Sequence, residues 1–103
     1  MCGIITRRKI LKYVMKQSLP NSLASLIDSA ETQGLPAQDL TNAQSFLDHI
    51  EFGLCFDTII TQIYEYEIEI TSEFYDSIIV IADQMKLPVE SYSFMKERIK
   101  KEL

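Results

Sequence analysis

The apolar side chains between residues 46 and 71 constrain the fold more than any other part of this 103-residue chain. Up to Ile63 they recur at intervals of three and one, which is the spacing of one face of an α-helix. This stripe consists of Phe52, Cys55, Phe56, Ile59, Ile60 and Ile63. The opposite face carries uncharged or acidic residues. The pattern therefore predicts a helix over residues 51–66 that is buried along one side, with the rest of the chain packed around it.

The pattern changes at Tyr64. Residues 64–70 alternate strictly between aromatic or aliphatic side chains and glutamates, which is the period of an extended strand. Residues 78–81 are β-branched without interruption, and such a run weakly favours a strand as well. A short hairpin from residues 64–70 and 76–82, within a small α+β fold, is therefore the alternative to an all-helical chain.

Two helices are expected before residue 35. Apolar pairs spaced by four residues predict a helix over residues 7–17, and the Leu19-Pro20 pair is expected to end it. Asn21 is a good N-cap for the second helix. Gly34 lies where a left-handed residue closes a helix, and the proline two residues later prevents continuation.

Three more helices are expected over residues 36–49, 71–85 and 88–99, and Thr71 or Ser72 is expected to cap the second of them. The first should bury Leu40, Ala43, Leu47 and Ile50. Gly53 lies near the start of the central helix, where glycine costs about 1 kcal/mol relative to alanine, so we expect a neighbouring helix to cross closely there. The sequence thus predicts an all-α fold, a compact bundle of about five to six short helices.

Length and composition favour a single domain over residues 1–103 with an ordinary hydrophobic core. Cys55 belongs to the apolar stripe and is expected to be a buried, reduced thiol, as suits a cytoplasmic protein. The basic residues near the start are followed by no apolar signal region, and the longest apolar run is far too short to cross a membrane. We therefore expect a cytoplasmic protein without membrane contact.

Charge is distributed very unevenly along the chain. Residues 1–16 carry five basic and no acidic side chains, whereas residues 17–85 carry twelve acidic and no basic ones. The central carboxylates can pair only with the two basic ends, so some must face solvent or a partner. A merely solvated acidic surface is the simpler interpretation. The asymmetry favours a basic protein partner and disfavours direct binding of nucleic acid.

Signals for catalysis or a cofactor are thin. His49 is the one histidine, and the chain has no glycine-rich phosphate loop and no paired cysteine ligands. His49, Glu51, Cys55 and Asp57 can be imagined as a metal site, but Cys55 lies on the buried stripe. We therefore expect neither an enzyme nor a bound metal or cofactor.

The stronger candidates are for recognition. Tyr64 and Tyr66 lie among Glu65, Glu67 and Glu69 with no base nearby in the sequence. Tyrosine is enriched at interface hot spots, and surrounding acids steer a cationic partner. The alternative is that both tyrosines are core residues whose hydroxyls reach the surface, and at least one is expected to be half-buried.

Three runs in the middle of the chain combine uncommon residue choices: Phe46-Leu47-Asp48-His49, Glu51-Phe52-Gly53-Leu54 and Gln62-Ile63-Tyr64-Glu65-Tyr66. With residues 68–71, they resemble the MafI-type immunity family of bacterial polymorphic toxin and contact-dependent growth inhibition systems. The similarity covers residues 35–90, and the chain departs from the family pattern at Asp48, Cys55, Phe56 and Asp57. The resemblance implies a cytosolic helical protein that binds and neutralises a cognate toxin domain, often a nuclease such as an EndoU-type endoribonuclease.

The leading hypothesis is inhibition of such a toxin by covering its basic active-site region with an acidic surface. The residues expected to bind the toxin are Asp48, Glu51, Asp57, Tyr64, Glu65, Tyr66, Glu67 and Glu69. The alternative is an acidic helical adaptor or regulator that binds a basic host protein, and a small metalloenzyme is the third possibility.

Overall fold

The computed structural model describes residues 18–101, and its elements are all helical. They are α2 (Leu19–Gln33), α3 (Ala37–Asp48), α4 (Phe52–Glu65), α5 (Ser72–Gln84) and the 3₁₀-helix η1 (Val89–Arg98). The predicted all-α bundle is confirmed. The predicted helix over residues 7–17 lies outside the described residues, as does Cys2.

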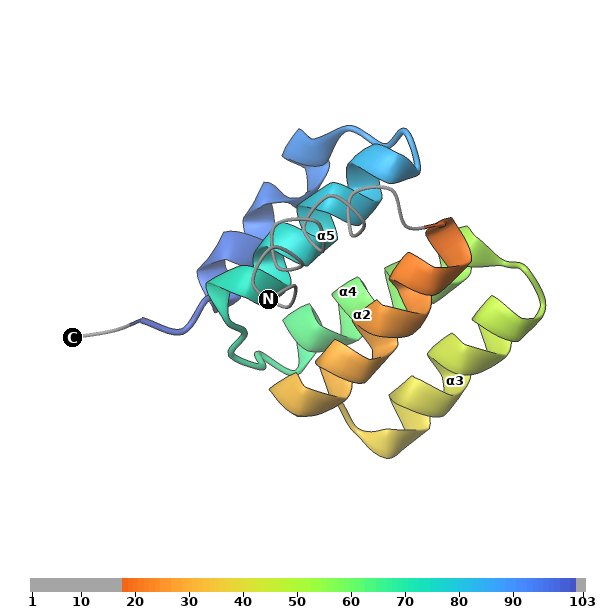
Figure 1. Ribbon diagram of the computed structural model, residues 1–103. Helices are drawn as coiled ribbons and strands as arrows, with labels where there is room; N and C mark the ends of the chain where they lie inside the picture. Colours follow the sequence, from red (N-terminus) through yellow and green to blue (C-terminus); the bar gives the residue numbers. More distant parts are fainter. Residues whose placement is uncertain (1–17, 102–103) are drawn as a thin grey trace, which may run out of the picture.

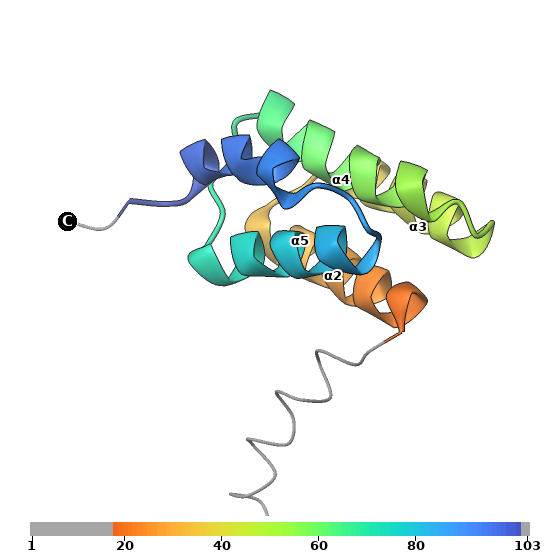
Figure 2. The ribbon, with the colours of Figure 1, turned by 90° about the horizontal axis from the view of Figure 1, so that it is seen from above.

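The helices form two layers (Figures 1 and 2). One layer contains α2 and α5, and the other contains α3, α4 and η1. The most extensive contact is between α3 and α4, and α2 touches α3, α4 and α5. The predicted stripe of α4 lies between the layers: Cys55, Phe56, Ile59, Ile60 and Ile63 are buried, and Phe52 is partly buried against them.

Helix α2 begins earlier than predicted. The expectation that Asn21 caps this helix is wrong, because Ser18 is the N-cap and its hydroxyl accepts a hydrogen bond from the Asn21 N–H at 3.4 Å. Leu19 and Pro20 lie in the first turn of α2, and the end of the helix predicted before them lies outside the described residues. Proline is tolerated in the first helical turn, where its missing N–H has no intrahelical partner. At α5 the predicted cap is confirmed, since the Thr71 hydroxyl accepts from the Phe74 N–H at 3.0 Å.

The four α-helices of residues 18–101 end in one common way. In each, a residue with positive φ follows the last turn, and the N–H of the next residue donates to a carbonyl five positions back. The left-handed residues are Gly34, Ile50, Glu67 and Lys86, with φ of 110°, 61°, 56° and 63°. The matching bonds run from Leu35 to Ala30, Glu51 to Phe46, Ile68 to Ile63 and Leu87 to Ala82. This is the Schellman arrangement, which satisfies carbonyls that a helix end leaves unpaired.

The alternative hairpin is wrong. Helix α4 continues to Glu65, and residues 76–82 lie inside α5. Within residues 18–101, Ile70 makes an isolated parallel bridge with Ile99. The β-branched run at residues 78–81 is helical because Ile78 and Ile81 are buried core residues of α5, and packing of this kind overrides a weak strand preference. The last helix, predicted to be α-helical, is a 3₁₀-helix that buries Met95.

Two predictions around the α3–α4 turn are also wrong. Ile50 was expected in the core but is 72% exposed, because α3 ends at Asp48 and the left-handed turn directs Ile50 outward. Gly53 was expected at a close helix crossing, but a Cβ built on it has no neighbour within 4 Å. Gly53 therefore fills no packing requirement of this fold.

Alanine in place of Gly34 and alanine in place of Gly53 are expected to change the stability in opposite directions. Gly34→Ala should lower the free energy of unfolding by about 1–2 kcal/mol, because a side chain in the left-handed region is strained. Gly53→Ala should raise it by about 0.5 kcal/mol, because alanine fits the open space and restricts the unfolded chain. Urea unfolding followed by circular dichroism measures both. A loss of stability in Gly53→Ala would contradict the open surroundings of this residue.

Candidate functional site

The residues predicted to bind a partner lie along α4 and at both of its ends. Asp48 and Glu51 flank the turn before α4, Asp57 lies on its second turn, and the others follow from its last turn onward. Seven of the eight are exposed and Tyr64 is half-buried. Since a helix of 14 residues is about 20 Å long, the structure does not bring the eight into one cluster.

At the N-terminal end of α4, two exposed apolar side chains lie among the acidic residues that were predicted to bind a partner. Ile50 is 72% and Leu54 50% exposed, and Asp48 and Glu51 are their close neighbours in the turn. We call Asp48, Ile50, Glu51 and Leu54 the turn patch. Its backbone is held by hydrogen bonds from the Ile50 N–H to the Leu47 carbonyl at 3.0 Å and from the Glu51 N–H to the Phe46 carbonyl at 2.8 Å. The turn patch is thus built on an ordered helix end.

The order of residues in this turn is reversed relative to the other three helix ends. After α2, α4 and α5, a glycine or charged residue takes the left-handed position and an apolar residue follows it onto the core, in the pairs Gly34-Leu35, Glu67-Ile68 and Lys86-Leu87. After α3 the apolar residue comes first, as Ile50, and the acid second, as Glu51. The reversal leaves a β-branched side chain both strained and exposed. Ile50 follows Leu47 by three residues, which is a helical spacing, and for that reason the sequence predicted that Ile50 would be buried.

A polar network lies in the groove between α3 and α4. Gln62 Nε2 donates to Asp39 Oδ1 at 3.0 Å and to the Tyr66 hydroxyl at 3.2 Å. Tyr66 is half exposed, and its hydrogen bond with the Asp39 carboxylate, together with partial burial, raises the pKa of its hydroxyl. The groove is lined by Asp39, Asn42, Phe46, Asp57, Thr58, Thr61 and Gln62. Tyr66 is therefore a fixed aromatic side chain at the surface.

Asp39 is the residue of this network that the sequence analysis did not identify. Asp39 is only 6% exposed. It lies in the first turn of α3, where the helix dipole favours a carboxylate. Nothing in the local sequence pattern indicates that the Gln62 side chain, 23 positions away, donates a hydrogen bond to Asp39.

Tyr64 lies on the other side of α4, against η1. Its hydroxyl donates to Glu97 Oε1 at 3.1 Å, and the Arg98 guanidinium carbon lies 4.1 Å from the centre of its ring. The Phe94 ring meets it edge-on at 4.9 Å between centroids. The hydrogen bond to the Glu97 carboxylate raises the pKa of the Tyr64 hydroxyl. The expectation that at least one tyrosine is half-buried is confirmed, and Tyr64 joins α4 to the C-terminal residues.

The acidic surface is uneven. Residues 18–101 contain 14 carboxylates and five basic side chains, and every carboxylate except that of Asp39 is exposed. The basic C-terminal end runs beside residues 65–70: the Lys100 N–H donates to the Ile70 carbonyl at 2.7 Å, and Lys100 and Glu69 line the same shallow hollow. Glu69, on the C-terminal side of α4, therefore lies close to a basic residue. The acids of the turn patch lie at the opposite, N-terminal end of α4.

The imagined metal site does not assemble. Cys55 is fully buried, and burial raises the pKa of its thiol to about 11, whereas His49, Glu51 and Asp57 are exposed. Within residues 18–101, no group of three or more His, Cys, Asp or Glu side chains is placed to hold a metal ion. The expectation that Cys55 behaves as a small buried hydrophobic residue is confirmed. In the same part of the chain, no helix has the length and apolar character needed to cross a bilayer.

Comparison of the chain with known protein families, with curated proteins and with solved structures finds no match.

Proposed function

We propose that this protein binds and neutralises a cationic bacterial toxin domain, and that the turn patch with the adjoining outer face of α4 is its binding surface. The proposal requires no chemistry by this chain. A nuclease exposes a basic cleft for phosphates, and an acidic protein seated on that cleft excludes the nucleic acid. The resemblance to immunity proteins supplies the class of partner.

The observation that carries the proposal is the exposure of Ile50 and Leu54 beside the exposed carboxylates of Asp48, Glu51 and Asp57. Interfaces typically combine a few apolar anchors with a polar rim, and the rim steers the encounter. Asp57, three residues after Leu54, extends the acidic rim along α4 into the groove lined by Gln62, whose amide bonds the Tyr66 hydroxyl. The surface thus offers apolar contact, negative charge and one fixed aromatic ring.

Tyr64 has a different part in this proposal from the one that the sequence suggested. Its ring face is covered by Arg98 and its hydroxyl is bonded to Glu97. We therefore assign the aromatic contact to Tyr66 and give Tyr64 the role of holding η1 on α4. Glu65, Glu67 and Glu69 remain steering groups of lesser weight, because Lys100 lies beside Glu69 and Arg98 stacks on Tyr64 in the last turn of α4.

The partner can be tested directly. The toxin domain to use is the one encoded by the reading frame immediately upstream of this gene, expressed in a heterologous bacterium. Co-expression of this protein should restore growth, and the purified pair should form a complex with reduced nuclease activity. Growth arrest that persists despite stable expression of both proteins would contradict the proposal. A complex without any change in toxin activity would favour the adaptor alternative.

Replacing Ile50 by glycine separates folding from binding. Ile50→Gly should raise the free energy of unfolding by roughly 1 kcal/mol, because glycine adopts φ near 61° without strain and the lost side chain was mostly exposed. The same change should weaken toxin binding about tenfold or more, since an apolar anchor is removed. Urea unfolding and calorimetric titration measure the two effects. Val80→Gly, which removes an exposed apolar side chain from α5, is the control and should leave affinity unchanged.

Two charge reversals of equal size rank the acidic groups. Changing Asp48, Glu51 and Asp57 to lysine should slow association at low salt by about tenfold or more, because electrostatic steering is lost. Changing Glu65, Glu67 and Glu69 to lysine should have a smaller effect, because the C-terminal bases already reduce the field there. Stopped-flow association at several salt concentrations measures both. A larger effect of the second set would move the interface to the far end of α4.

A further inference from the structure

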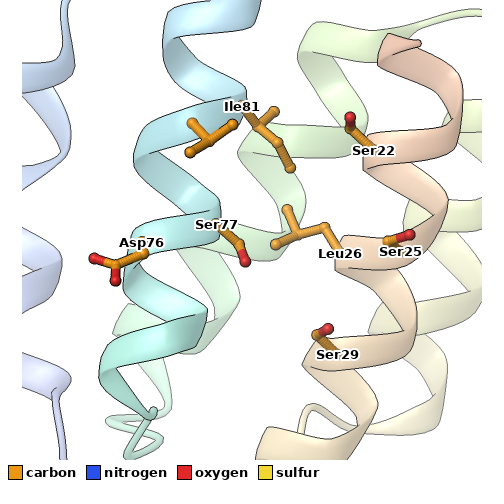
Figure 3. Close-up of a pocket in the computed structure, with 8 residues that line it drawn as sticks. Ser22, Ser25, Leu26, Ser29, Asp76, Ser77 and Ile81 are labelled. Atoms are coloured by element: carbon orange, nitrogen blue, oxygen red, sulfur yellow. The ribbon is translucent and has the colours of Figure 1, made fainter. Parts of the chain in front are cut away.

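A groove that the proposed function does not use lies between α2 and α5. Its volume is about 350 Å³, and its lining is Ser22, Ser25, Leu26, Ser29, Asp76, Ser77, Val80 and Ile81. Figure 3 shows Leu26 and Ile81 directed into the space between the two helices, with the serines along α2 and Ser77 on α5. The floor is therefore apolar, and the α2 side is made of small residues that permit close approach of another backbone.

The α5 side of this groove is apolar and acidic together. Val80 is 42% exposed and also lines two neighbouring hollows with Ile79 and Val89. Asp76 and Asp83 are exposed on the same helix, four residues before and three after Val80, so they lie on the same side of α5 as Val80. An occupant of this groove needs an apolar face and positive charge on the flank that meets α5.

We propose that residues 7–17 of the same chain occupy this groove as an amphipathic helix. Ile10 with Val14 and Leu11 with Met15 are spaced by four residues, which gives a helix one apolar face. The same segment holds five basic and no acidic side chains, which matches the acidic flank of α5. Among residues 1–17 it is the one stretch with this combination.

Chain geometry is consistent with this occupant. The segment leads directly to Ser18, the N-cap of α2, and Ser22 of the first turn of α2 already lines the groove. A helix running back from there lies antiparallel to α2, and the distance from Ser22 to Ser29 is about 10 Å along the helix axis. An 11-residue helix is about 16 Å long and covers it.

The handedness of the helix also fits. Lys16 lies nearly opposite the apolar face of such a helix. With that face on the groove and its direction antiparallel to α2, a right-handed helix turns Arg8 and Lys12 toward α5, not toward α2. Those bases then lie over the helix that carries Asp76 and Asp83. The consequence is that the basic N-terminal segment neutralises the α2–α5 layer and leaves the α3–α4 side, with the turn patch, as the negative surface of the molecule.

Paramagnetic relaxation in the full chain tests this proposal independently of any toxin. In a Cys2→Ser background, a spin label is attached to Ser25→Cys beside the groove or to Thr61→Cys in the α3–α4 groove, both at exposed positions. Cys55 is fully buried and takes no label in the folded protein. We expect the amide signals of residues 10–15 to be lost with the label at position 25 and retained with the label at position 61.

Matched substitutions connect the result to the groove. Val80→Lys should restore the lost signals by placing a positive charge beside the bases, whereas Leu54→Lys, on the other side of the molecule, should not. Retained signals with the label at position 25, equal loss from both labels, or no effect of Val80→Lys would each overturn the proposal. Signal loss in a mixture of spin-labelled and isotope-labelled molecules would assign the groove to a second copy and would overturn it as well.

Discussion

Burial of one face of α4 is the interaction on which the rest of the structure depends. Phe56, Ile59 and Ile63 are almost completely buried between the two layers, and each such side chain contributes about 1.5–3 kcal/mol relative to exposure. The Phe56 ring also meets Tyr92 of η1 at 5.3 Å, so the same face holds the C-terminal helix. Because α4 runs through the middle of the bundle, its two ends and its outer side are what the molecule offers for recognition.

The sequence predicted the parts of this fold that depend on local spacing. The stripe of α4, the left-handed Gly34 and the Thr71 cap each follow from residues a few positions apart, and all three are present in the structure. The failures share one cause. Ile50, Gly53 and Asp39 are decided by where α3 ends and by what lies across from it, which neighbouring residues do not specify.

The same limit applies to the site. The acidic character of the surface could be predicted from composition, because twelve carboxylates without a base cannot all be paired. Which of these carboxylates have basic neighbours could not be predicted from composition. The parallel bridge between Ile70 and Ile99 and the stacking of Arg98 on Tyr64 bring the C-terminal bases to the last turn of α4. Two groups of acids that look equivalent in the sequence thus differ in the field they produce, and the turn patch is the group at the other end of the helix.

The residue order at the end of α3 is difficult to explain by folding alone. A Schellman turn requires a left-handed residue and is completed by an apolar residue after it, and three helix ends of this protein follow that order. Ile50 and Glu51 have the opposite order. The left-handed conformation is strained for the β-branched Ile50, and its apolar side chain is left in water. Neither effect stabilises the bundle, since Ile50 is 72% exposed. Residues with strained or locally unfavourable conformations are concentrated at functional sites, where contacts with a partner can offset the strain. This is the physical reason for placing the proposed interface at the turn patch and not at the more acidic residues 65–69.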